Sequence, residues 1–261
     1  MPTRTSATVG APTWVDLSTS DVASVRSFYC DLFGWTADEP NEEFGGYFMF
    51  SRDGVPVAGG MAKQSAEVPD TWSIYLATDD IEKTLAAATA EGGTVVVPAM
   101  RVGDTGTMAF VIDPAGAAIG VWQPQDFFGF ATYAETGAPS WWELLTKDYA
   151  TALSFYRDVF GWDTAVMGDT DEFRYSVAMD GENQSAGVMD AAAFLPEGVP
   201  SHWSVYFAVD DADAALARVQ ELGGTVVAPA EDTPYGRLAT AADPGGAQFK
   251  LVAPNAAMPA R

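Results

Sequence analysis

The chain has 261 residues, of which 48% are hydrophobic and 19% charged, so it is long enough for two globular domains and has no disorder-type composition. Its formal net charge of −23 at pH 7 is spread over both halves of the sequence. This excess repels phosphate backbones and anionic lipids, so we expect no nucleic acid and no membrane surface as partners.

The cysteine content and the N-terminal segment bear on the compartment. The only cysteine, Cys30, excludes an intramolecular disulfide and indicates a reducing environment. Residues 1–11 lack the apolar stretch of a signal peptide, and no run of about 18 uncharged apolar residues occurs elsewhere. The sequence therefore predicts a cytoplasmic protein. Cys30 falls within a helical pattern without a histidine nearby in sequence, so we assign it no catalytic role.

The N-terminal half predicts two copies of a βαβββ unit, because alternating and helical hydrophobic patterns follow one another in that order. The first unit comprises a strand at 13–18, a helix from Ser20 or Asp21 to Gly34, a strand from Trp35, and a hairpin of 47–51 and 55–61. The second comprises a strand at 71–78, a helix from Asp79 or Asp80 to Ala90, and strands at 94–98, 107–112 and 117–122.

The C-terminal half repeats this order. Between Trp14–Trp35 and Trp141–Trp162, at an offset of 127, twelve of twenty-two positions are identical, and Trp203–Asp211 matches Trp72–Asp80 at an offset of 131. A repeat of this length indicates two copies of one domain. We therefore predict a first domain at 11–124, a linker at 125–139 and a second domain at 140–256.

Two motifs, taken with the repeat, carry a resemblance to a known family. The helix pattern S-F-Y-x-x-x-F-G-W ends at Trp35 and again at Trp162, and a D-P-x-G turn begins at Asp113 and Asp243. The chain thus resembles the vicinal oxygen chelate superfamily, the glyoxalase, bleomycin-resistance and extradiol-dioxygenase group, in its tandem two-domain actinobacterial form. Members of that form are often labelled glyoxalases or hydroxylases. The resemblance implies an α+β fold of four βαβββ units forming two tandem open barrels, each with a ligand cavity on its concave face.

The resemblance also implies where a divalent metal is held, and this chain departs from the pattern there. The implied ligand positions are occupied by Trp14, Ser73 and Gly120 in the first half and by Trp141, Ser204 and Lys250 in the second. None of these side chains is a ligand for Zn²⁺, Fe²⁺ or Mn²⁺, and an ammonium repels a cation. We therefore expect neither a metal nor another cofactor.

Strand alternation predicts which other side chains face the same cavity as these positions. The expected substrate-binding residues are Trp14, Asp16, Ser73, Tyr75, Trp122, Trp141, Ser204 and Gln248. The second half adds acid–base groups that the first half lacks, and its candidate catalytic residues are Glu143, His202, Tyr206 and Lys250. Aromatic walls with a few polar groups are typical of a small-molecule pocket.

Structural alternatives stay open for several of these residues. Trp14 and Trp141 are also interpreted as side chains that fill the barrel core. Glu143 and Lys250 also suit a structural ion pair, since a buried carboxylate requires a partner. His202, the only histidine, begins its strand after a turn and also suits a solvated rim.

Three functions are consistent with the sequence. The first is metal-independent binding or sequestration of a hydrophobic aromatic molecule, a metabolite or antibiotic such as an aromatic polyketide. The second is a metal-free enzyme of hydroxylase, isomerase or lyase type acting on such a molecule. The third is a structural protein whose cavities are filled by its own side chains. In the first two the partner is a small molecule, and the sequence allows a monomer or a homodimer.

Overall fold

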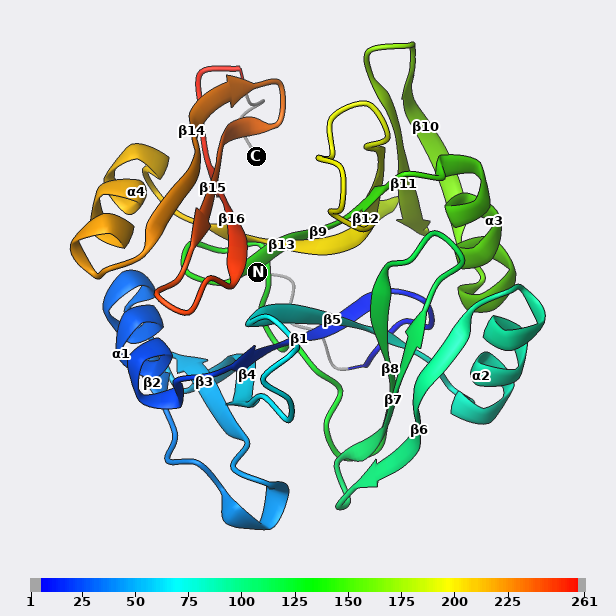
Figure 1. Cartoon of the computed structure of the whole chain (residues 1–261), viewed down its shortest axis with the longest axis horizontal. Helices are drawn as coiled ribbons and strands as arrows, with labels where there is room; N and C mark the ends of the chain where they lie inside the picture. The colour runs from blue at the N-terminus through cyan, green and yellow to red at the C-terminus, as the bar shows by residue number, and fades with distance from the viewer. Residues whose placement is uncertain (1–5, 258–261) are drawn as a thin grey trace.

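The computed structural model describes residues 6–257. Over this range the chain forms two eight-stranded sheets, one from each half, each accompanied by two helices (Figure 1). No helix in this range is both long and apolar enough to cross a bilayer.

Each half contains two consecutive βαβββ units. The first half has β1 Pro12–Thr19, α1 Val22–Phe33, β2 Thr36–Ala37, a short 3-10 helix Glu42–Phe44, β3 Phe48–Arg52, β4 Val55–Ala62, β5 Thr71–Ala77, α2 Ile81–Ala90, β6 Thr94–Val102, β7 Gly106–Ile112 and β8 Ala118–Pro124. The second half has β9 Pro139–Thr146, α3 Tyr149–Phe160, β10 Asp163–Asp169, β11 Arg174–Asp180, β12 Asn183–Asp190, β13 His202–Ala208, α4 Ala212–Glu221, β14 Thr225–Thr233, β15 Gly236–Ala242 and β16 Gln248–Ala253.

The strand order is the same in both sheets. It runs β2-β3-β4-β1-β5-β8-β7-β6 in the first and β10-β11-β12-β9-β13-β16-β15-β14 in the second. At the centre of each sheet, the first strands of its two units pair antiparallel, namely β1 with β5 and β9 with β13. On its other side each of these strands has a parallel neighbour, which is β4 for β1, β8 for β5, β12 for β9 and β16 for β13. The sheets are curved but not closed, and this agrees with the expected fold of two tandem open barrels.

The helices α1 and α3 begin and end on the same local signals. The side chains of Asp21 and Asp148 accept hydrogen bonds from backbone amides of the first turn. Gly34 and Gly161 end the helices with a φ of 71°, a left-handed conformation that glycine adopts without steric penalty. The repeated sequence therefore codes for the same helix twice.

Each of these helices reaches across to the other half of the chain. The Tyr29 hydroxyl in α1 donates to Asp243 at 3.0 Å, and the Tyr156 hydroxyl in α3 donates to Asp113 at 3.1 Å. Figure 1 shows the consequence, with α1 beside α4 and α3 beside α2. The helices α1 and α3 and the two D-P-x-G turns thus join the two halves within one chain.

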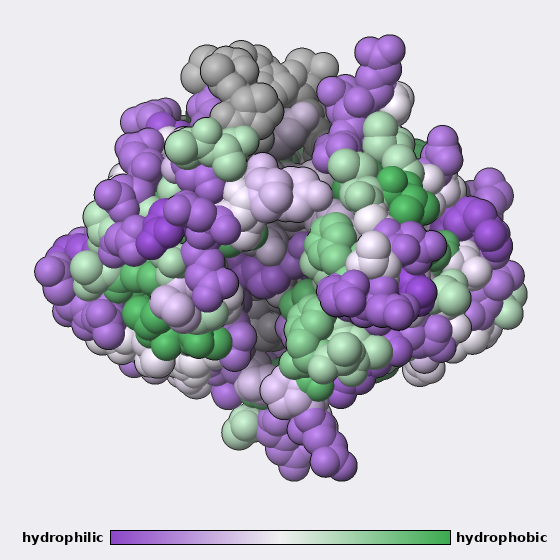
Figure 2. Space-filling model, turned by 90° about the horizontal axis from the view of Figure 1, so that it is seen from above, coloured by the Kyte–Doolittle hydropathy of each residue, from purple (hydrophilic) through white to green (hydrophobic). Residues whose placement is uncertain are grey.

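The two sheets pack through their convex faces and turn their concave faces outward on opposite sides (Figure 1). Trp72 and Phe207, from the two central strands β5 and β13, meet at this contact with ring centroids 5.3 Å apart. In β1, Val15 and Leu17 are fully buried toward the contact, whereas Trp14 and Asp16 alternate onto the concave side. Figure 2 looks onto the concave side of the second sheet and shows a hollow near the middle of that face.

The structure confirms the α+β fold of four βαβββ units and corrects the length of several strands. The strand predicted at 94–98 continues to Val102, because two register shifts let β6 bend and remain paired with β7. The strand expected from Trp35 is reduced to Thr36–Ala37. The division at 11–124, 125–139 and 140–256 stays a prediction.

Candidate functional site

Glu143, on the central strand β9, is the acceptor in a compact hydrogen-bond network on the concave face of the second sheet. Its Oε2 accepts from Lys250 Nζ at 2.6 Å and from the Tyr206 hydroxyl at 2.8 Å. Lys250 Nζ also donates to the Tyr206 hydroxyl at 3.0 Å. Only 7% of the Glu143 side chain and 17% of the Lys250 side chain are exposed, so this ion pair is largely shielded from water.

Strand register brings these three side chains together. Tyr206 on β13 is the direct neighbour of Lys250 on the parallel strand β16. Ser204, two residues earlier on β13, is the direct neighbour of Glu143 on the antiparallel strand β9. Since side chains two residues apart share a face, the acid, the phenol and the ammonium converge from three adjacent strands.

Burial fixes the protonation state of the phenols in this network. Desolvation, strengthened by the Glu143 carboxylate, holds the pKa of Tyr206 well above its ordinary value, so the hydroxyl stays protonated and donates. Desolvation likewise raises the pKa of Tyr175 on β11, which hydrogen-bonds the same carboxylate and accepts from Trp141 Nε1 at 3.0 Å. Glu143 is therefore supplied with three donors.

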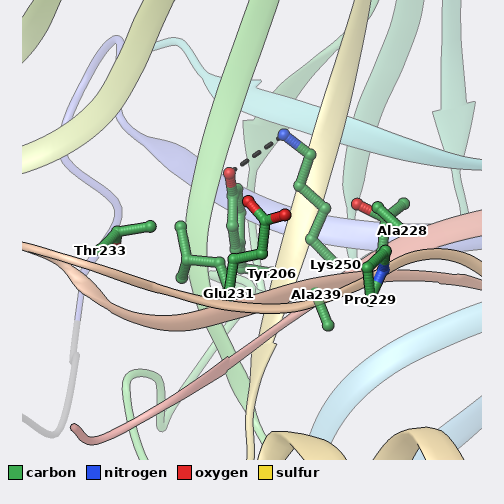
Figure 3. A pocket seen from close by; sticks show the side chains of 9 residues that line it. Tyr206, Ala228, Pro229, Glu231, Thr233, Ala239 and Lys250 are labelled. Atoms are coloured by element: carbon green, nitrogen blue, oxygen red, sulfur yellow. Dashed lines mark hydrogen bonds between the residues drawn. The ribbon is translucent and has the colours of Figure 1, made fainter.

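A cavity of about 280 Å³ opens beside this network. It is lined by Tyr206, Ala228, Pro229, Glu231, Thr233, Leu238, Ala239, Thr240 and Lys250, from β13 to β16. In Figure 3 the Lys250 ammonium and the Glu231 carboxylate point into the same space, close to the Tyr206 hydroxyl. The cavity has apolar walls from the β14–β15 hairpin and a polar floor, and this combination is typical of small-molecule pockets.

The first sheet carries a related arrangement with a different charge balance. Asp16 on β1 is buried and hydrogen-bonded to Tyr75, and desolvation, only partly offset by that bond, raises its pKa to about 7. Trp14 Nε1 donates to the Tyr47 hydroxyl at 2.8 Å, as Trp141 does to Tyr175. Gly120 stands where Lys250 stands in the second half, so β8 provides no ammonium for Asp16.

Aromatic rings occupy the space beside Asp16 that forms a cavity in the second half. The Tyr75 ring lies directly over Gly120, and a Cβ at that position would collide with it. The Phe110 ring packs against Tyr75 with centroids 5.2 Å apart. Phe127 from the segment between the halves packs against Trp14 at 4.8 Å and accepts a hydrogen bond from Trp122 Nε1 through its carbonyl oxygen. The first site is thus packed with its own side chains.

The remaining candidates from the sequence lie outside the Glu143 network. His202 begins β13, with its Nδ1 2.9 Å from the Pro200 carbonyl oxygen, and it does not line the cavity. Gln248, expected beside Lys250 on the inner face, is exposed at the start of β16 and does not line the cavity either. Ser73 and Ser204 are the cross-strand neighbours of Asp16 and Glu143.

Sequence reasoning did not find the β14–β15 wall or the two inner phenols. Glu231 and Thr240 line the cavity, and Tyr47 and Tyr175 bond the inner tryptophans, yet none was a candidate. Alternation along β15, anchored on Thr240 beside Lys250, would have identified Leu238 and Thr240. No comparable signal existed for Glu231, because register shifts in β14 interrupt the alternation.

A model of the Glyoxalase/Bleomycin resistance protein/Dioxygenase superfamily matches this chain twice, over residues 11–121 and 138–251. The chain belongs to this superfamily. Among its relatives is the "Putative glyoxylase CFP32" of Mycobacterium tuberculosis, 40% identical over 97% of this chain and 98% of that protein. The "Anthracycline biosynthesis protein DnrV" of Streptomyces peucetius is 37% identical over 93% of both chains.

Solved structures of the superfamily share the fold at low sequence identity. The Mn(II)-bound glyoxalase from Novosphingobium aromaticivorans aligns with a TM-score of 0.65 at 17% identity, over 94% of this chain and 82% of the other. The 2,3-dioxygenase LapB from Pseudomonas sp. KL28 aligns with a TM-score of 0.63 at 16% identity, over 95% and 93%. At these identities the likeness concerns architecture alone.

The donor set of this superfamily member does not fit a divalent metal at the implied positions. Trp14, Ser73 and Gly120 offer at most a hydroxyl, and in the second half Lys250 places an ammonium there. Across residues 6–257 no three His, Cys, Asp or Glu side chains gather in a way that could hold a metal ion.

Proposed function

We propose that this protein binds a planar, largely apolar aromatic molecule, of the aromatic polyketide type, in the cavity of its second half. The observation that carries the proposal is the cavity itself, with apolar walls at Leu238, Ala228 and Pro229 and polar groups at Tyr206 and Lys250. The relation to proteins named for anthracycline biosynthesis supports this ligand class, because anthracyclines are polycyclic aromatic polyketides.

Lys250 supplies the polar contact for the ligand. An ammonium has three N–H donors, of which two are directed to the Glu143 carboxylate and the Tyr206 hydroxyl. The third remains for a ligand oxygen, such as a quinone carbonyl or a phenol. A charge-assisted hydrogen bond in a shielded site is stronger than a neutral one, so this contact orients a ligand that apolar packing holds.

The size of the cavity limits the ligand. Its volume of about 280 Å³ lies at the small end of the range of roughly 300–1,000 Å³ for small-molecule pockets. A few fused rings fill such a space, and larger substituents extend through the open mouth. The first site, packed with Tyr75, Phe110 and Phe127, leaves no comparable room in this conformation, so we expect one ligand per chain.

The Glu143 network favours a second function, a metal-free acid–base step on the same ligand. A carboxylate held beside an ammonium removes a proton from carbon next to a ligand carbonyl, while Lys250 stabilises the resulting enolate oxygen. Return of that proton to another carbon completes an isomerisation with atoms and charge balanced.

Tryptophan fluorescence tests the binding proposal, since the chain has eight tryptophans and quinones quench them. We expect saturable quenching by a dihydroxyanthraquinone. Thr240→Phe copies the first half's Phe110 into the cavity and should weaken binding at least about tenfold. The reciprocal Phe110→Thr should leave the affinity unchanged. Equal affinity in wild type and Thr240→Phe would overturn the assignment of the site.

Mass spectrometry and proton exchange separate the enzyme from the binder. With a ligand that has a C–H bond next to its carbonyl, such as a tetralone, deuterium from D₂O should enter that carbon, or the isomer should appear, only if Glu143 transfers protons. Glu143→Gln should abolish this exchange and keep most of the affinity. Exchange that persists in Glu143→Gln would remove this residue from the chemistry.

A further inference from the structure

Glu231 is a carboxylate of the cavity that the Glu143 network does not use. It lies on β14 opposite Leu238 of β15, and both residues line the cavity. Its side chain is exposed, and within residues 6–257 it has neither a hydrogen bond nor an ion-pair partner. A free negative charge thus faces the space in which we place the ligand.

The neighbouring carboxylate shows that this lack of a partner is specific to the position. Asp232, the next residue on β14, pairs with Arg237 at 3.4 Å on the other face of the hairpin. Arg237 is also bound to Asp213 at 2.6 Å. Strand alternation therefore directs Asp232 toward a cation and Glu231 toward the cavity.

With Glu143 counted beside the lining side chains, the charged groups at the cavity sum to a negative value. Lys250 is the one lysine, arginine or histidine among the described residues that line the cavity, and its charge is already balanced by Glu143 at 2.6 Å. Glu231 adds a further negative charge in a protein whose net charge is −23. Such a pocket repels anions and concentrates cations at its mouth.

The first half lacks this feature. Met100 occupies the position of Glu231 on the equivalent strand β6, opposite Met108, and its side chain is 53% exposed. The first half therefore forms the same hairpin with an apolar residue at this point, so the fold itself does not require a carboxylate here. The Glu231 carboxylate is thus a feature of the second cavity alone.

We propose that Glu231 binds a protonated amine of the ligand. This inference rests on the proposed function and narrows its ligand class to an amphiphilic aromatic molecule with two polar ends. An oxygen meets Lys250 and Tyr206 at the floor, the planar body packs against Leu238 and Pro229, and an ammonium on a flexible substituent meets Glu231 at the mouth. An exposed pair of this kind contributes modestly by itself, and the ligand body strengthens it by excluding water.

A matched pair of probes tests the proposal, namely hydroxymethyl-anthraquinone and its aminomethyl analogue, which is protonated at pH 7. We expect the aminomethyl probe to bind wild-type protein about threefold to tenfold more tightly, with the difference shrinking as salt is raised. Glu231→Gln should remove this preference while leaving the affinity for the hydroxymethyl probe unchanged. Asp232→Asn, which removes the adjacent outward-facing charge, should retain the preference for the aminomethyl probe.

The possible outcomes show separately whether the role of Glu231 fails and whether the proposed ligand binding fails. If neither probe quenches the tryptophans, the binding proposal itself fails. If the hydroxymethyl probe binds and the aminomethyl probe binds no better, the function stands and the role of Glu231 is wrong. A preference for the aminomethyl probe that survives in Glu231→Gln also contradicts the inference, because another group would then bind the ammonium. A preference that disappears equally in Asp232→Asn contradicts it as well, because the preference would then reflect the general negative charge of the hairpin.

Discussion

The two halves of this chain fold alike and yet carry opposite kinds of interior. At equivalent positions the second half has Lys250, Thr240 and Glu231, whereas the first has Gly120, Phe110 and Met100. Both halves keep a carboxylate that is hydrogen-bonded to a tyrosine on the neighbouring strand. These pairs are Asp16 with Tyr75 and Glu143 with Tyr206. The polar half has a cavity, and the apolar half is packed with rings.

The difference lies in how each half compensates its buried carboxylate. Glu143 is paired with the Lys250 ammonium beside a polar cavity. Asp16 has one phenol as its hydrogen-bond donor, so its charged form is poorly stabilised and its pKa is raised to about 7. One fold thus holds an open site with an ion pair and a closed site whose carboxyl is bonded to a phenol, and each of the following changes acts on that contrast.

The largest effect is expected from Lys250→Met, which leaves Glu143 buried without its cation. Breaking a largely buried ion pair costs about 3–5 kcal/mol of unfolding free energy, and urea denaturation at pH 7 measures it. Adding Glu143→Gln to Lys250→Met should recover much of the lost unfolding free energy, because the buried side chain at position 143 is then neutral. Lys83→Met, which breaks an exposed pair on α2, should change little. A double variant as unstable as Lys250→Met would mean that packing, not charge, is responsible.

The next effect is a pH dependence from Asp16. Its folded pKa of about 7 lies above the unfolded value of 3.8, so between these pH values the folded state binds the extra proton. Its contribution is fully present below pH 3.8 and is lost as the pH rises through 7, with a slope approaching about 1.4 kcal/mol per pH unit. Asp16→Asn should remove this slope in urea titrations at several pH values. An unchanged slope would show that Asp16 is ionised throughout.

Gly120→Ala tests the closed packing of the first half. The new methyl group meets the Tyr75 ring, and such overpacking costs about 1–3 kcal/mol. In a Tyr75→Leu background the same substitution should cost less, since the obstructing ring is absent. Equal costs in the two backgrounds, measured by thermal or urea unfolding, would refute the contact.

The smallest effect distinguishes the two phenols. Tyr206→Phe removes one of several donors to Glu143 and should cost about 1 kcal/mol at pH 7. Tyr75→Phe removes the bond that lowers the pKa of Asp16, so that pKa should rise further and the loss of stability with pH should shift upward. The same shift in Tyr206→Phe would contradict the assignment of the titrating group to Asp16.

Much of the fold was predictable from local signals. The repeat, the Asp21 and Gly34 helix limits and the D-P-x-G turns gave the four βαβββ units, since caps and turns depend on neighbouring residues. The convergence of Glu143, Tyr206 and Lys250 followed from strand alternation, whereas Gln248, placed by the same rule, is exposed. Alternation gives the face of a strand and not the depth of the cavity beside it.

The sequence by itself determined the family, the paired units and the absence of metal-type side chains at the implied positions, because each depends on residue identity at fixed spacing. Only the tertiary structure decided which site is open, that Tyr29 and Tyr156 reach the turns of the opposite half, and that Glu231 faces the cavity without a partner among the described residues. These features join segments up to 214 residues apart or depend on bends in a hairpin. Their physical basis is the relative position of side chains in space, which no local pattern specifies.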